Sequence, residues 1–252
     1  MSNQADVKMK SLQKALDVLN CFVEKPSLGV TEIATMLDLN KSNVHSILST
    51  FKAMDYLEQD PESGRYHLGI GVFTLCRALG DRFSIAQVAK PFMQELSDMA
   101  NECVYLGIPQ EDTVIYLETI YPAESTSLMR SIMGEQAKMY CTGIGKAIMA
   151  YLPKEQIEEY ASKDLIGFTE RTITQKDKLL RDLELTKARG YAIDDMEHEF
   201  GVRCVAAPIL NRHGTVEAAV SISGPSLRFE GDRILELAEM LKQTVRKIEM
   251  RL

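Results

Sequence analysis

The sequence predicts an α+β protein in which a small N-terminal domain and a larger domain are joined by a linker helix. The chain has 252 residues, which is more than one small domain needs. Residues 10–69 hold segments of helical periodicity followed by a short hairpin pattern, whereas strand-like and helical segments alternate farther on. The expected domain limits are 1–69 and 84–252, with the linker helix at 70–83.

Composition is that of an ordinary globular protein. Hydrophobic residues make up 45% of the chain and charged residues 26%. The net charge of −7 lies mostly in the larger domain, because residues 1–80 hold 8 Lys/Arg and 9 Asp/Glu. No apolar run is long enough to span a membrane and the start lacks a signal peptide, so we expect a cytosolic protein. The five scattered cysteines form no CxxC motif, which argues against disulfides and a zinc ribbon.

The N-terminal segments predict a winged helix-turn-helix. A helix is expected over residues 10–24. Its apolar face holds Leu12, Leu16, Leu19 and Val23, with Ala15 and Phe22 beside them. Thr31 is placed to cap the second helix, and the third begins near Lys41 with an apolar stripe running from Val44 to Met54. The run "YLEQDPESGRYHLG" then reads as a β-hairpin.

Polar side chains occupy the side of the third helix opposite its apolar stripe. Short hydrogen-bonding side chains allow a helix to approach base edges in the major groove, and a lysine near its start can meet a phosphate. The alternative is a polar face in plain solvent. The candidate DNA contacts are Thr31, Lys41, Ser42, Asn43, His45, Ser46 and Ser49 on the helices and Arg65 on the hairpin.

The larger domain is expected to contain a mostly antiparallel sheet. A helix over residues 85–101 contains Pro91 and is followed by the strand-like runs "CVYLGI", "TVIYLETI" and "SLMRSI". Helices are then expected in "TGIGKAIMAYL" and "KEQIEEYA" and over residues 174–189. The strands "YAID", "CVAAPIL" and "VEAAVSIS" precede a final helix over residues 231–251. Turns at "PQED" and "NRHG" join neighbouring strands as hairpins.

The string "GIGK" is not a complete phosphate-binding loop, because Ala147 follows Lys146 where Ser or Thr is required. Gly143 and Ile144 nevertheless open a helix, and their free N–H groups favour an anion. Thr142 could instead act only as the N-cap of that helix.

Further polar residues suggest a pocket. Ser221 and Ser223 are two apart on a strand and share one face, which is either a polar pocket floor or an exposed surface. Asp194 ends one strand and Cys204 begins another. Cys204 could also be the nucleophile of a thiol enzyme with His198 as its base. These two residues and Asp194 are also of the types that bind zinc, although no metal spacing motif supports a zinc site. Met129, Met133 and Met139 are candidates either for apolar pocket walls or for the core.

The segments "KSLQKALDVLNCF", "TEIATMLDLNKSNVHSIL", "GRYHLGIGVFTL", "CTGIGKAIMA", "DDMEHEFGVRCVAAPI" and "AAVSISGP" resemble, in order, the motifs of the IclR family of bacterial transcription regulators. The resemblance implies a GAF-like C-terminal domain that binds a small effector, and dimers through the front half that form tetramers on DNA. It also implies an oxo-acid pocket made by Gly143, Ile144, Asp194, Cys204, Ser221 and Ser223.

Two residues depart from the family pattern on the third helix. Asn43 and Ser46 stand where the family often has Thr and Arg, which reduces the expected phosphate affinity. In the pocket, Ile144 stands where related sensors can have Ala and is expected to narrow it. We interpret the chain as a DNA-binding regulator, a repressor by resemblance, that is controlled by a 2-oxo or sugar acid and needs no cofactor. The expected partners are a double-stranded operator and a second copy of the chain.

Overall fold

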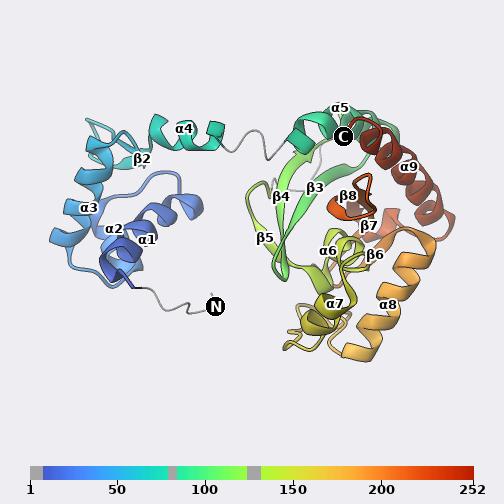
Figure 1. Cartoon of the computed structure of the whole chain (residues 1–252). Helices are drawn as coiled ribbons and strands as arrows, with labels where there is room; N and C mark the ends of the chain where they lie inside the picture. Colours follow the sequence, from blue (N-terminus) through green and yellow to red (C-terminus); the bar gives the residue numbers. More distant parts are fainter. Residues whose placement is uncertain (1–7, 79–83, 124–131) are drawn as a thin grey trace. The chain divides into compact units, whose positions relative to one another are not determined.

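The computed structural model describes residues 8–78, 84–123 and 132–252 (Figure 1). The chain forms two compact units, Met1–Arg82 and Phe83–Leu252, which are treated separately below. The end of the expected linker helix and most of the expected strand "SLMRSI" lie outside the described residues. No helix of the described segments is long and apolar enough to cross a membrane.

The first unit is a winged helix-turn-helix, as predicted. Its elements are α1 (Lys10–Glu24), α2 (Val30–Met36), α3 (Lys41–Ala53), β1 (Leu57–Gln59), β2 (Tyr66–Leu68) and α4 (Ile70–Ala78). β1 and β2 pair antiparallel, with Leu57 opposite Leu68. The three helices enclose a small core that includes Val18, Phe22, Leu28, Ile33 and Leu48.

The predicted apolar face of α1 is buried only in part: Phe22 and Leu19 pack in or against the core. Leu12, Leu16 and Val23 are 54%, 49% and 76% exposed, and α1 packs inward through Val18 and Phe22. α1 carries two apolar stripes, and packing within the domain decides which stripe is buried. The expected stripe of α3 is buried at Val44 and Leu48, but Met54 at its end is exposed.

The predicted cap of α2 was also wrong. α2 begins after Gly29, and Thr31 lies inside its first turn. Glu32, at the third helical position, accepts a hydrogen bond from the N–H of Gly29 at 2.9 Å. This hydrogen bond is one half of a capping box. It makes Gly29 the N-cap, two residues before the predicted cap Thr31.

The second unit contains a six-stranded antiparallel sheet with the order β5-β4-β3-β8-β7-β6. The strands are β3 (Cys103–Gln110), β4 (Thr113–Ile120), β5 (Gln136–Lys138), β6 (Ala192–Asp195), β7 (Val202–Leu210) and β8 (Val216–Pro225). The edge strand β5 was not predicted. The turn between β3 and β4 is shorter than expected, because Pro109 pairs with Val114 within the ladder.

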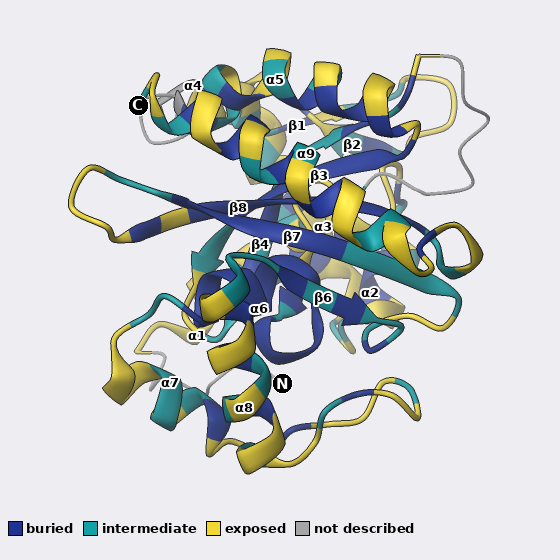
Figure 2. Ribbon diagram, turned by 90° about the vertical axis from the view of Figure 1, so that its right-hand side faces the viewer, coloured by how far each residue is buried: buried dark blue, intermediate teal, exposed yellow. Residues whose placement is uncertain are grey.

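Helices cover both faces of this sheet, as Figure 2 shows. α5 (Ser84–Ala100) and α9 (Asp232–Glu249) cover one face, and α6 (Gly143–Met149), α7 (Lys154–Ala161) and α8 (Lys176–Arg189) cover the other. Successive side chains of β3 point to opposite faces of the sheet and so belong to different cores: Tyr105 packs on the α6 side and Val104 on the α5 side. The ligand cavity described below lies on the α6 side.

Candidate DNA-binding surface and ligand cavity

The predicted DNA-contacting residues of α3 form an exposed face, while Val44 and Leu48 on the inner side are fully buried. Ser46 donates its hydroxyl hydrogen to the carbonyl of Ser42 at 3.0 Å and keeps its oxygen lone pairs free to accept from a ligand. The exposed residues of this face are Lys41, Ser42, Asn43, His45, Ser46 and Ser49.

The start of α3 suits contact with an anion. Asn40 is the N-cap residue, and its side chain makes no capping hydrogen bond. First-turn N–H groups therefore lack the usual side-chain acceptor, and the helix dipole favours a negative group at this end. Lys41 follows immediately and is exposed.

Arg65 has a structural role that the sequence did not reveal. Its guanidinium donates to the hydroxyl and the carbonyl of Ser27, at 3.1 and 2.7 Å, and pairs with Glu32 at 2.8 Å. The pKa of Glu32 is lowered, first by the N–H of Gly29 and then by Arg65. Arg65 therefore ties the wing to the start of α2, and much of its charge and hydrogen-bonding capacity is already used.

In the second unit, a cavity of about 200 Å³ lies between the start of α6 and the sheet. The six predicted pocket residues line it: Gly143, Ile144, Asp194, Cys204, Ser221 and Ser223. Met139 does not line it. Met139 packs in the core against Gly145, where an added Cβ would meet its backbone at 2.3 Å. Met133 is 62% exposed, and Met129 lies outside the described residues.

Strand register brings the polar residues together. Asp194 pairs with Cys204, and Cys204 pairs with Ser223, so one row of side chains crosses β6, β7 and β8. The next row on the same face places Ser221 beside Tyr105. Both serines are only 3% exposed and their hydroxyl oxygens are 3.3 Å apart, which excludes the exposed-strand interpretation.

The start of α6 closes the cavity. Thr142 is the N-cap, as the alternative interpretation held: its hydroxyl accepts from the N–H of Gly145 at 3.1 Å. Thr142 also lines the cavity. A Cβ at Gly143 would lie 3.2 Å from that of Cys204, so a glycine here lets the helix start approach β7 closely.

The cavity is acidic and well shielded. Burial raises the pKa of Asp194 to about 7, even though the N–H of Glu197 donates to its Oδ1 at 2.7 Å. Burial, with Asp194 nearby, raises the pKa of Cys204 well above its usual value. Glu135, Glu199 and His198 also line the cavity, whose described lining contains no Lys or Arg. A bound anion would therefore have to be held by N–H and hydroxyl donors.

These environments disfavour catalysis. Cys204 with a raised pKa stays protonated and is a poor nucleophile, because the thiolate is the reactive form. The Nδ1 of His198 lies 3.8 Å from Sγ of Cys141, whose pKa burial raises to about 12. Within the described segments, no group of three or more His, Cys, Asp or Glu residues could hold a metal ion.

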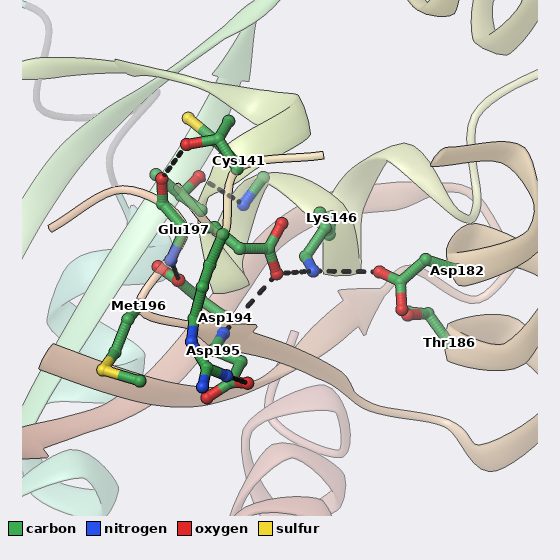
Figure 3. Close-up of polar contacts among 12 residues, drawn as sticks. Cys141, Lys146, Asp182, Thr186, Asp194, Asp195, Met196 and Glu197 are labelled. Carbon is green, nitrogen blue, oxygen red and sulfur yellow. Dashed lines mark hydrogen bonds and ion pairs between the residues drawn. The ribbon is translucent and has the colours of Figure 1, made fainter. Parts of the chain in front are cut away.

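A buried charge cluster adjoins the cavity and was missed by sequence reasoning. The Nζ of Lys146 lies 2.5 Å from Oε1 of Glu197 and 2.9 Å from Oδ2 of Asp182 (Figure 3). Lys146 is 1% exposed, and every residue of α6 is buried. The lone lysine in the apolar string "GIGKAIMA" was the available signal, because a buried lysine needs a partner.

The two units together define a DNA-binding regulator in which a winged helix-turn-helix precedes a separate α+β domain with a ligand-sized cavity. Residues 11–61 match the IclR helix-turn-helix domain. Residues 77–250 match the family described as bacterial transcriptional regulator IclR C-terminal. The chain therefore belongs to the IclR family of transcriptional regulators, which are DNA-binding proteins and not enzymes.

Relatives and solved structures agree with this assignment. The chain is 33% identical over 241 residues to the regulator KdgR of Escherichia coli, covering 95% of this chain and 91% of KdgR. It is 32% identical over 246 residues to KipR of Bacillus subtilis, covering 97% and 98%. The structure of Thermotoga maritima IclR is similar with a TM-score of 0.82 and 29% identity, covering 97% of this chain and 99% of that one.

Proposed function

We propose that the chain is a repressor whose affinity for its DNA operator is controlled by a small monocarboxylic acid bound in the α6 cavity. One observation carries this proposal: Asp194, Cys204, Ser221, Ser223 and the start of α6 converge on one cavity, and Asp194 and the two serines are buried there. All of them line the cavity, where a carboxylate and a hydroxyl of a ligand can reach their polar groups.

The geometry favours an acid that also carries a hydroxyl, an oxo group or a hydrated carbonyl. The N–H groups at the start of α6 and the hydroxyls of Ser221 and Ser223 can hold one carboxylate. Asp194 can accept a hydrogen bond from a hydroxyl at the other end of the ligand. With Glu135 and Glu199 also present, a second carboxylate on the ligand would be repelled.

A structural neighbour shows that the same fold can hold a ligand of this class. An IclR homologue from Microbacterium hydrocarbonoxydans was crystallised with 4-hydroxybenzoate, a small monocarboxylic acid with one hydroxyl. Its TM-score is 0.84 at 24% identity, covering 96% of this chain and 98% of that one. That likeness establishes a common fold, and the ligand itself remains a property of the neighbour.

For the DNA half, the exposed polar face of α3 is proposed to enter the major groove, with Lys41 and the helix start at the phosphates. Thr31 and Arg65 are proposed to contact the flanking backbone, with Arg65 weakened by its ion pair to Glu32. Repression is supported by one relative, the HTH-type transcriptional repressor AllR of Escherichia coli, which is 31% identical to this chain over 242 residues.

A homodimer is proposed to present two such helices to a two-fold operator, with tetramers forming on DNA. Exposed apolar side chains in the first unit support this, because a soluble monomer rarely leaves so many on one small domain. These residues are Met9, Leu12, Leu16 and Val23 around α1 and Ile70, Phe73 and Leu75 on α4.

The ligand half of the proposal is tested by ligand-observed NMR with a panel of acids that includes pyruvate, gluconate and 4-hydroxybenzoate. Saturation transfer to one acid without turnover, abolished in Asp194→Ala but not in the exposed-surface control Ser162→Ala, would support a sensor cavity. Steady consumption of an acid would instead indicate an enzyme. No binding to any acid would remove the proposed ligand class and leave the DNA-binding assignment unaffected.

A further inference from the structure

The segment that carries Asp194 makes a tight turn directly after β6. Met196, inside this turn, has φ of 61°, a left-handed conformation that is uncommon for residues other than glycine. Such a conformation persists only where surrounding contacts hold it. The turn ends at Glu197, whose N–H donates to Oδ1 of Asp194 at 2.7 Å. The backbone N–H of His198 also donates to Asp194, so the turn that Glu197 holds in place sets the position of the carboxyl group in the cavity.

Glu197 is anchored through its carbonyl and its side chain. Its carbonyl accepts from the hydroxyl of Thr172 at 2.5 Å, and its Oε1 accepts from Lys146 at 2.5 Å and, more weakly, from the N–H of Asp195 at 3.5 Å. Its Oε2 has no hydrogen-bond partner among the described residues, and Glu197 is only 4% exposed. Lys146 is therefore the main compensation for a buried carboxylate, and removing it leaves an unpaired charge in the interior.

Lys146 also belongs to the helix that forms the opposite wall of the cavity. α6 begins with Gly143 and Ile144 at the ligand space and carries Lys146 one turn later. The second partner of Lys146, Asp182, lies on α8 and does not line the cavity. Burial alone lowers the pKa of Lys146, but Glu197 and Asp182 outweigh it and raise the pKa, so the ammonium stays charged.

We propose that Lys146 is a positioning residue for the ligand cavity: through its ion pair with Glu197 it fixes the turn whose N–H orients Asp194 (Figure 3). The two walls of the cavity, the start of α6 and the end of β6, are thereby held at a fixed spacing. This inference rests on the proposed ligand role of the cavity, but its test needs no ligand.

The test compares Lys146→Met/Glu197→Gln with Asp182→Asn in the full-length protein. The double variant removes the ion pair without leaving Glu197 as a charged partner-less carboxylate. Asp182 also loses its cation, but its side chain is 22% exposed and keeps contact with water, so the double variant should fold where Lys146→Met alone fails. Thermal unfolding checks this rescue. Asp182→Asn is the matched control, because it removes the other partner of Lys146 and leaves the link to Asp194 intact.

The first readout is hydrogen exchange of the backbone amide at position 197. In the double variant we expect this amide to exchange at least tenfold faster, while the amide of Val205 in the neighbouring strand stays within threefold. Asp182→Asn should leave both amides within threefold. An amide at position 197 that stays equally protected in the double variant would overturn the proposal.

The second readout is the midpoint of the Asp194 titration, followed by NMR of its carboxyl carbon. A purely structural role of Lys146 would not shift this midpoint in a specific direction. The double variant removes one positive and one negative charge, whose direct effects on the pKa of Asp194 oppose each other. Loss of the N–H donor then raises the midpoint by about 1 pH unit. The same shift in Asp182→Asn would indicate general loosening and contradict the proposal. Failure of all acids to bind would leave both readouts valid.

Discussion

Asp194 on β6 lies directly opposite Cys204 on β7, and both side chains line the same buried cavity. Neither has a cation beside it in the described lining of that cavity. An anionic ligand would therefore meet a carboxyl group whose pKa burial raises from 3.8 to about 7. When Asp194 is protonated, an anionic ligand can bind beside it without repulsion from a carboxylate.

Binding of a monocarboxylic acid should depend on pH. Asp194 is protonated below its pKa of about 7 and charged above it, so the affinity for the carboxylate form of the ligand should be steady below pH 7 and fall above it. The decrease is at most tenfold per pH unit for one proton. Isothermal titration calorimetry in two buffers of different ionisation enthalpy measures the proton taken up.

Asp194→Asn should remove the dependence of ligand affinity on pH. His198 also lines the cavity, so His198→Gln is measured beside it to show how much of that dependence comes from the imidazole. Affinity that is unchanged between pH 6 and pH 8 in the unmodified protein would contradict the assignment. The same pKa affects folding: between pH 4 and pH 7 the folded chain holds a proton that the unfolded chain has lost, so this group's contribution to stability decreases as pH rises through that range.

Ser42→Ala with Asn43→Ala should weaken operator binding. Both side chains are exposed on the polar face of α3 and point away from the domain core, so the fold should be retained. The expected loss is roughly 1–3 kcal/mol for each lost base contact. Fluorescence anisotropy on an operator duplex selected from a random library measures it, with Ser162→Ala as the control. Full affinity in the double variant would remove this face of α3 from the DNA interface.

Ile144→Ala should change which acids bind. Ile144 lines the cavity and packs against Gly107, where an added Cβ would meet its side chain at 3.0 Å. Shortening Ile144 adds space at the helix start, so larger acids should gain affinity relative to pyruvate. The acid panel measured on both proteins by NMR gives the ratio. An unchanged ratio would mean that Ile144 does not limit the ligand.

Gly145→Ala should destabilise the second unit. In an ordinary helix this change stabilises by roughly 1 kcal/mol, but here the Cβ would lie 2.3 Å from the backbone of Met139. We expect a net loss of roughly 1–3 kcal/mol in the free energy of unfolding, measured by urea denaturation. Gly167→Ala, whose nearest contact would be 3.7 Å, is the control and should change little.

Local patterns predicted most of the fold. The bounds of α1 were predicted to the residue, and the alternation of Ser221 and Ser223 indicated a shared face correctly. β5 was missed because three residues carry no measurable period and form a strand only by pairing with β4. Which stripe of α1 is buried depends on contacts with the rest of the domain, which sequence periodicity does not contain.

The candidate site was likewise predicted only in part from the sequence. Residues of the cavity follow recognisable motifs, and register then brings Asp194, Cys204 and Ser223 into one row. The partners of Arg65 and Lys146 could not be predicted, because Ser27 and Glu197 are 38 and 51 positions away. Met139 was assigned to the cavity by residue type alone, and its place is decided by the close approach of Gly145.

The most direct test of the account is the reciprocity of ligand and operator binding. Operator affinity is measured by fluorescence anisotropy with and without a saturating amount of the acid that binds, and acid affinity with and without operator. We predict that each ligand weakens the other by the same factor, because a coupling free energy is shared between two sites. Equal operator affinity with and without saturating acid would contradict the proposed control of DNA binding by the α6 cavity.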